Sequence, residues 1–493
     1  MSSFIYAQTM SSLMPSLSIQ EANDLFGSSS EDENDDDKER NQNVPFAIQL
    51  EMKNILLKYR NNNTLNKFNK SMYEKYLMSV KLYECNNLEE LLSISSEIAI
   101  ITYNLLKEHK GWPHQSVKDL HLLSQLFLAH NYVLLKQFKT CIQCIDKIFT
   151  VHGASKIVTM YLSLIIPKIK SSNAFKLSPS GKKIEFVQSL YVDKILIPEM
   201  NANNNNRQQI PKMKQCSLDI FKKEFLNTET AIIFTDIMAK ENGYSGAINK
   251  WKDINFWINN FGYRFVPIEI GRFPQFCEEQ QVENSFSSWK EEMITIENFF
   301  NTYLIPSIQR IEMRQKRNGN NNDDDNNLEK IKDQLNVYKY LPAIDTVAYL
   351  AQHNLFEQFK ILKNDIGTPK YCHIRGRKVQ HVNMWFGTDG TVTPLHFDSY
   401  DNFLMQVIGY KYVRLYEKSQ TKYLYRDNTG VEYAQGNMTN VSIEYPDKMK
   451  HPEFGNAKYT ETILMPGDTL FIPSGMWHYV RSLTPSLSIN YWF

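Results

Sequence analysis

The chain has 493 residues, which is enough for two or three domains that each bury a core of their own. Hydrophobic residues make up 42% and charged residues 22%, the proportions of an ordinary soluble globular protein. The 55 basic side chains are balanced by 54 acidic ones, so the protein has no large net positive charge that would attract nucleic acid or an anionic membrane. We therefore expect neither as a direct partner.

Targeting and membrane signals are weak in this sequence. No stretch reaches the roughly 18 consecutive apolar residues that a membrane helix needs, and the most apolar run, 157–169, contains Pro167 and predicts a buried helix. No lysine or arginine precedes Lys38, whereas a secretory signal begins with a basic region. The 6 cysteines show no disulfide framework, so we expect a nuclear or cytosolic protein.

The first 190 residues predict a tail followed by a helical domain. Residues 1–44 end in an acidic run and predict a disordered acidic tail. Across 45–190, leucine and isoleucine recur with a period near 3.6, which indicates helical hairpins. Cys141 and Cys144 form a C-x-x-C, but no second pair follows at zinc spacing, so we interpret them as helix positions. The domain shows no chemistry, and its predicted role is to bind a protein partner.

The remainder of the chain predicts a linker and a β domain. Residues 191–214 are polar and asparagine-rich, as linkers are, and a second low-complexity run at 318–327 predicts an exposed insert. From 215 to 493, short runs of period two between Gly, Pro and Asp predict an antiparallel β domain, with the segment between Tyr425 and Thr460 expected to form surface loops. The clearest predicted strands are 231–234, 263–270, 403–408, 411–416, 462–465, 469–472 and 487–493.

Three residues of this domain predict an iron site. In a strand, side chains two apart share a face, so His396 and Asp398 are expected to point the same way. A second histidine, His478, follows a Pro-Gly-Asp turn and a short strand much later in the sequence. Two histidines and one carboxylate in this pattern make the facial triad of non-haem Fe(II) enzymes, which leaves one side of the metal open for an oxo-acid and O2. Manganese, cobalt or zinc would fit the same ligands.

A pocket for the oxo-acid is expected beside the metal. Lys411 alternates with Val413 on what we expect to be the interior face of its strand, where a buried ammonium needs an anionic partner such as the distal carboxylate of 2-oxoglutarate. Alternation alone leaves open the opposite arrangement, in which the aromatic face is buried and Lys411 is exposed. Thr393 and Asn402 offer hydrogen bonds nearby, and the last strand places Asn490 on a small polar face suited to a cofactor cavity.

Several motifs carry a resemblance to a known family. The motifs are V-P-I-E-I-G at 266–271, Y-L-A-Q-H at 349–353, N-M-W-F-G at 383–387, T-P-L-H-F-D at 393–398, N-F-L at 402–404, G-Y-K-Y-V-R-L-Y at 409–416, P-G-D at 466–468, F-I-P at 471–473 and W-H-Y-V-R at 477–481. With these motifs the sequence resembles the Jumonji-C family from about 229 to 493.

The resemblance implies the architecture and the further site residues. It implies an α+β protein, in which an N-terminal α-helical domain precedes a double-stranded β-helix of the jelly-roll or cupin type, with the triad at its open end. Glu269 and Trp385 would line the target side-chain pocket, a carboxylate and an aromatic face suited to a guanidinium. The residues that would bind 2-oxoglutarate are Tyr349, Thr393, Asn402 and Lys411.

The predicted activity is therefore that of an Fe(II)- and 2-oxoglutarate-dependent dioxygenase, with O2 as second cosubstrate, that hydroxylates a side chain of a protein or peptide substrate. Arginine is the preferred target. Two alternatives stay open at this point: demethylation of histone N-methyl-lysine through the same site, and a non-catalytic cupin-like binding module.

Overall fold

The computed structural model describes residues 87–108, 115–171, 207–272, 290–311, 346–427, 436–444 and 446–493, together with Phe186 and scattered residues between 74 and 82. The predicted acidic tail at 1–44, the insert at 318–327 and most of the predicted linker lie outside these residues. The protein divides into two compact units, Met1–Ser178 with Tyr263–Phe265, and Pro179–Gly262 with Val266–Phe493. The predicted domain limits stay predictions.

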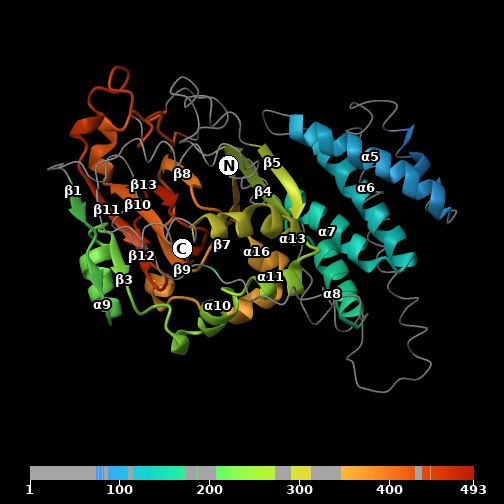
Figure 1. Ribbon diagram of the computed structural model, residues 1–493, viewed down its shortest axis with the longest axis horizontal. Helices are drawn as coiled ribbons and strands as arrows, with labels where there is room; N and C mark the ends of the chain where they lie inside the picture. The colour runs from blue at the N-terminus through green and yellow to red at the C-terminus, as the bar shows by residue number, and fades with distance from the viewer. Residues whose placement is uncertain are drawn as a thin grey trace. The chain divides into compact units, whose positions relative to one another are not determined.

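The first unit is helical, and its helices pack each against the next in the sequence (Figure 1). Their apolar faces meet in one core, as the period of leucine and isoleucine predicted. The residues 263–265 belong to this unit through a buried ion pair of 2.6 Å between Arg264 and Asp146. The helices are α5 (Leu88–Glu108), α6 (Gln115–Leu134), α7 (Phe138–His152) and α8 (Lys156–Ser171).

The two cysteines of the C-x-x-C lie on α7 and face the core of the helical unit. Cys141 and Cys144 are both buried, and burial raises the pKa of the Cys144 thiol to about 12. Thiols with raised pKa values stay protonated at neutral pH and are poor ligands and nucleophiles. Their interpretation as helix positions agrees with this burial.

Two β-sheets form the second unit. The smaller has the strand order β1-β11-β10-β13-β8 and the larger has the order β2-β3-β12-β9-β14-β7-β6-β4-β5. Their bounds in sequence order are β1 (Arg207–Gln209), β2 (Lys212–Met213), β3 (Ile232–Phe234), β4 (Phe265–Arg272), β5 (Lys290–Thr295), β6 (Thr346–His353), β7 (His381–Gly387), β8 (Val392–His396), β9 (Asn402–Ile408), β10 (Lys411–Tyr416), β11 (Tyr459–Leu464), β12 (Thr469–Ile472), β13 (Trp477–Ser482) and β14 (Ser486–Trp492).

Short helices accompany the larger sheet. Apolar side chains of α11, α13 and the outward strand faces share one large core cluster, so the helices shield that face of the sheet from water. The helical segments are α9 (Leu218–Ile220), η3 (Phe221–Leu226), η4 (Lys240–Asn242), α10 (Ser245–Lys250), α11 (Ile254–Phe261), α13 (Ile296–Phe299), η8 (Phe300–Leu304), α16 (Leu355–Gln358), η9 (Lys360–Asp365) and η10 (Lys370–Gly376).

The two sheets share an interior and the smaller sheet has a second buried face. Val413 and Leu415 of β10 pack in one cluster with Leu470 of β12, from the other sheet. The opposite face of β10 carries Tyr412 and Tyr416, which pack with the segment after β10, where η11 (Lys418–Tyr423) and η12 (Phe454–Asn456) lie. All six residues of β10 are therefore buried.

The predicted α+β fold class is confirmed, since a helical region precedes a sheet-rich one (Figure 1). The clearest predicted strands correspond to β3, β4, β9, β10, β11, β12 and β14, with ends that differ by at most a few residues. The segment between Tyr425 and Thr460 was expected to form surface loops. In its described part it differs, because Val441, Ile443 and Phe454 are buried against the smaller sheet.

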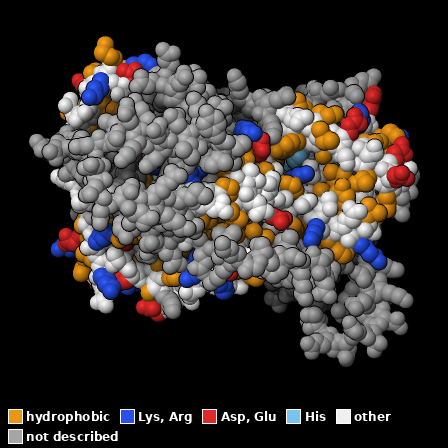
Figure 2. All heavy atoms as spheres, in the orientation of Figure 1, with side chains coloured by type: hydrophobic (Ala, Val, Ile, Leu, Met, Phe, Trp, Pro, Cys, Tyr) orange, Lys and Arg blue, Asp and Glu red, His pale blue; other side chains and the backbone are white. Residues whose placement is uncertain are grey.

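The visible surface of the described residues carries mixed charge. On the face drawn in Figure 2, basic and acidic side chains lie scattered among apolar and uncharged ones. Within the described residues, every helix is too short or too polar to cross a bilayer.

Candidate active site

Two histidines face each other from neighbouring strands. β8 and β13 pair in antiparallel fashion with His396 directly opposite His478, and their ring centroids lie 4.1 Å apart. The Nδ1 of His396 lies 2.8 Å from the carbonyl oxygen of Pro394, and that of His478 lies 3.0 Å from the carbonyl of Met476. Because a carbonyl only accepts, we assign the proton to each Nδ1, which leaves the lone pair of each Nε2 for a ligand. Burial lowers the pKa of His478 to about 4, so its ring is neutral.

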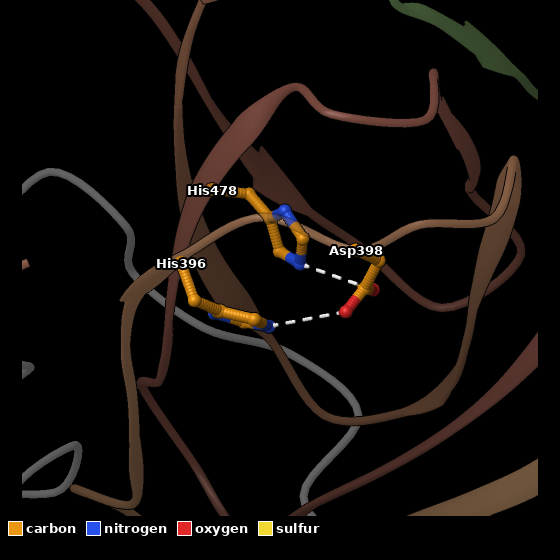
Figure 3. A group of neighbouring side chains, drawn as sticks. All are labelled: His396, Asp398 and His478. Carbon is orange, nitrogen blue, oxygen red and sulfur yellow. Dashed lines mark ion pairs between the residues drawn. The ribbon is translucent and has the colours of Figure 1, made fainter. Parts of the chain in front are cut away.

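The carboxylate of Asp398 completes the cluster (Figure 3). Its oxygens lie 3.7 Å from Nε2 of His396 and 3.6 Å from Nε2 of His478. Both separations are too long for a hydrogen bond, yet shorter than the roughly 4.2 Å that separates two ligand atoms on opposite sides of an ion bound at about 2.1 Å. Among the described residues these three side chains form the one group able to hold a metal ion. The donor set and the spacing therefore fit a ferrous ion.

The backbone places Asp398 in a way that strand alternation did not anticipate. β8 ends at His396, so Asp398 lies in the following loop and not on the strand face that the sequence suggested. Its carbonyl oxygen accepts a hydrogen bond of 2.8 Å from the amide of Gly475. Gly475 has a φ of +75° in the turn that leads into β13, a conformation that glycine adopts without strain. This hydrogen bond therefore connects the loop of Asp398 with the turn that precedes His478.

Lys411 is buried on the interior face of β10, as the first of the two arrangements left open by alternation predicted. Only 1% of its surface is exposed. Its Nζ lies 3.4 Å from the hydroxyl of Tyr349, and no carboxylate of the described residues forms a salt bridge with it. Burial lowers the pKa of Lys411 to about 7. A buried ammonium without an acidic partner indicates an anionic ligand.

Tyr349 lies at the centre of the remaining predicted residues. It is buried on β6, its hydroxyl hydrogen-bonds to Thr393, and burial raises its pKa well above the usual value. Its ring lies 5.9 Å from that of Trp385, and its strand neighbour on β4 is the half-buried Glu269. A Cβ at Gly387 would lie 2.7 Å from this ring, so the close approach of β6 and β7 requires glycine there. The structure therefore brings Glu269 and Trp385 beside Tyr349, whose hydroxyl lies next to Lys411.

A series of hydrogen bonds leads from Trp385 toward the loop that contains Asp398. Its Nε1 donates to Oδ1 of Asn490 at 2.9 Å, and Nδ2 of Asn490 donates to Oδ1 of Asn402 at 3.3 Å. Asn402 opens β9, four residues after Asp398. These bonds hold the indole in one orientation.

Asn383 is a polar residue of this face that the sequence analysis did not select. It lies opposite Asn490 and two residues before Trp385 on β7, and its buried Nδ2 has no hydrogen-bond partner among the described residues. The period of two along a strand would have predicted it, because residues 383 and 385 share a face and Trp385 was already a candidate site residue.

The sequence matches one family and is similar to several named proteins. Residues 217–493 match the family described as Cupin-like domain. The sequence is 32% identical over 457 residues to JmjC domain-containing protein F of Dictyostelium discoideum, covering 84% of this protein and 90% of that one. It is 33% identical over 291 residues to Lysine-specific demethylase 8 of Danio rerio, covering 59% of each. It is 29% identical over 250 residues to Jumonji C domain-containing protein 5 of Drosophila melanogaster, covering 50% of this protein and 51% of that one.

Proposed function

Because the protein belongs to the cupin-like domain family as a JmjC domain protein, we propose that it is an Fe(II)- and 2-oxoglutarate-dependent oxygenase that hydroxylates a protein side chain, with arginine as the target. The observation that carries the proposal is the buried Lys411, without a carboxylate partner among the described residues, on the same sheet face as a metal-binding histidine. The nuclear or cytosolic address expected from the sequence is part of this proposal.

The spacing along the smaller sheet supports a dicarboxylate between lysine and metal. Lys411 pairs with Ser482 of β13, and Leu415, four residues along β10, pairs with His478. At roughly 3.3 Å per residue these positions lie about 13 Å apart on one face. An extended five-carbon dicarboxylate, with a contact to the ammonium at one end and to the metal at the other, fits a separation of that order.

Each side chain of the site has a defined part in the proposed reaction. His396, Asp398 and His478 would hold Fe(II), which together with 2-oxoglutarate and O2 would supply the oxidising chemistry, with succinate and CO2 as the other products. Nζ of Lys411 keeps its proton once the distal carboxylate lies beside it, because the anion raises the pKa that burial had lowered. Tyr349 and Thr393 offer hydroxyl groups to the same carboxylate. Asn402 and Asn490 orient the end nearer the metal.

The pocket beside Tyr349 supports arginine as the target. Glu269 offers a carboxylate for the fork of a guanidinium, and Trp385, with its indole nitrogen bonded to Asn490, offers a fixed aromatic face. One oxygen atom of O2 enters a carbon–hydrogen bond of the target residue to give an alcohol, and the other leaves in succinate. On an arginine carbon this alcohol is stable.

Demethylation of N-methyl-lysine is the second candidate, and the name of the Danio rerio relative favours it. The same oxygen insertion at an N-methyl group gives an unstable hemiaminal that releases formaldehyde. The intact triad argues against the third possibility, a binding module without catalysis, because such a module has no need of three converging ligands.

Succinate formation from 2-oxoglutarate, Fe(II) and peptide tests the proposal, with His396→Ala as the matched control. We expect turnover in the wild-type protein and none in the variant; equal turnover in both would refute the site. Mass spectrometry separates the two reactions. Arginine peptides should gain one oxygen atom, whereas formaldehyde release with methyl-lysine peptides and no oxygen gain on arginine would replace hydroxylation by demethylation.

A further inference from the structure

A segment next to the site contacts both strands that carry the histidines. Residues 436–444, called the strap below, lie beside β8, which is the edge strand of the smaller sheet. Met438 forms an isolated antiparallel bridge with His396. The amide of Phe397 donates to the carbonyl of Asn437 at 3.1 Å, and the amide of Thr439 donates to the carbonyl of Leu395 at 3.3 Å. The backbone on either side of His396 is thereby held.

A hydrogen bond from a side chain adds to these backbone contacts. Nδ2 of Asn437 donates to the carbonyl of Phe397 at 3.0 Å. With this bond, the peptide group that links Phe397 to Asp398 contacts the strap directly. The strap therefore fixes the backbone between two of the three metal ligands.

The other end of the strap is anchored beside His478. The carboxylate of Glu444 is buried, accepts a hydrogen bond from the hydroxyl of Tyr479 and forms an ion pair with Arg481. Tyr479 directly follows His478 in β13, and Arg481 lies on the same strand. A buried ion pair of this kind is costly to break, because one charge is then left without compensation.

The middle of the strap is apolar and packs between these two ends. Val441 and Ile443 are 6% and 3% exposed and belong to the same core cluster as Leu395 and Trp477. Leu395 precedes His396, and Trp477 precedes His478. Residues adjacent to each histidine are thus packed against one continuous segment.

We propose that the strap positions the two histidine ligands relative to each other, with Glu444 as its anchor and Asn437 as its contact to the metal-binding loop. The inference rests on the proposed metal site. A metal ion binds tightly only when its ligand atoms are held within a few tenths of an ångström of the required geometry, so a loosened strap weakens metal binding even where the fold survives. Glu444 and Asn437 are positioning residues and touch neither metal nor substrate.

The neighbouring strands offer a matched control. Glu461 of β11 makes the same kind of buried network, accepting a hydrogen bond from Tyr412 and pairing with Arg414 at 3.7 Å. It lies on the same sheet, but its carboxylate bonds to side chains of β10, whereas the carboxylate of Glu444 bonds directly to side chains of β13, the strand of His478. Glu444→Gln and Glu461→Gln therefore both remove one buried negative charge, and only the first loosens the strap.

Mn(II) binding to the full-length protein without 2-oxoglutarate tests this inference. The binding is measured as the loss of the electron paramagnetic resonance signal of free Mn(II). We expect Glu444→Gln to weaken Mn(II) binding about tenfold, as loss of an outer ligand partner typically does, and Glu461→Gln to leave it unchanged. Thermal unfolding of both variants measures their stability. Equal Mn(II) affinity in wild type and Glu444→Gln, with both folded, overturns the inference.

Asn437→Ala keeps the test decisive if Glu444→Gln does not fold. It removes only the 3.0 Å hydrogen bond to Phe397 and leaves the buried ion pair intact. We expect a loss of about threefold to fivefold in Mn(II) affinity, the size of one neutral hydrogen bond. No loss in Asn437→Ala, or an equal loss in Glu461→Gln, contradicts the strap. Absence of Mn(II) binding in the wild-type protein contradicts the metal site instead.

Discussion

The two faces of the smaller sheet bury cations in opposite ways. On the outer face, Arg414 has Glu461 and Arg481 has Glu444 as carboxylate partners. On the inner face, Lys411 is equally buried, yet no carboxylate of the described residues pairs with it. A buried charge that serves the fold is compensated within the protein, whereas one that serves a ligand is left for the ligand to compensate. Burial alone therefore does not distinguish the two roles. They are distinguished by whether a carboxylate of the protein pairs with the buried cation.

The largest expected effect comes from breaking an outer pair. Arg414→Met removes the partner of Glu461 and leaves that carboxylate buried without its cation, so we expect a loss of about 3 to 5 kcal/mol in the free energy of unfolding. Urea unfolding measures it. Restoring neutrality with the double variant Arg414→Met, Glu461→Gln should recover part of the loss; a single variant as stable as wild type would show that the outer pair does not serve the fold.

Removing the inner cation, Lys411, should not lower the stability of the ligand-free protein, in contrast to removing Arg414. Lys411→Met removes a buried ammonium that has no carboxylate partner among the described residues, so the ligand-free protein should be as stable as wild type or more so. The affinity for 2-oxoglutarate should fall about 30-fold or more, because a buried charge partner is typically worth about 2 kcal/mol or more. Calorimetric titration in the presence of Mn(II) measures this. Unchanged affinity would mean that another group holds the distal carboxylate.

The pH dependence sharpens the same contrast. Burial lowers the pKa of Lys411 to about 7, so Nζ is protonated below that pH and increasingly neutral above it. Since the bound anion requires the ammonium, the affinity for 2-oxoglutarate should be constant below about pH 7 and fall about tenfold per pH unit above it. Lys411→Met should bind weakly with no such slope. The stability of the ligand-free wild type should rise with pH from about 7 to 10, because the unfolded protein binds more protons there.

The smallest effect concerns the hydrogen bonds that orient Trp385. Asn490→Ala removes the 2.9 Å bond from the indole nitrogen and the 3.3 Å bond to Asn402. We expect the KM for an arginine peptide to rise about fivefold, equivalent to roughly 1 kcal/mol for one hydrogen bond. Steady-state kinetics at saturating 2-oxoglutarate measures it. A KM that stays constant would show that binding of the target does not require these two hydrogen bonds.

Local patterns determined more of the site than of its surroundings. The spacing of His396 and Asp398, the turn before His478 and the alternation of the last strand are all readable along the sequence, because each is a short-range feature. The family motifs extended this to Tyr349, Glu269 and Trp385, which the structure brings together on the larger sheet. The order of a helical region before a sheet-rich one is likewise a property of local period.

Only the tertiary structure decided which side of β10 faces the interior shared by the two sheets and which contacts hold the histidine-bearing strands. Alternation could not place Lys411 inside, because both faces of β10 are buried and period two distinguishes faces only when one of them meets water. Alternation also predicted that Asp398 lies on the same strand as His396, whereas β8 ends at His396 and Asp398 lies in the following loop. The strap could not be predicted from the sequence for a similar reason. Glu444 pairs with Arg481 and Met438 forms a bridge with His396, and the residues of each pair lie about 40 positions apart in the sequence. Local sequence patterns do not predict contacts over such separations.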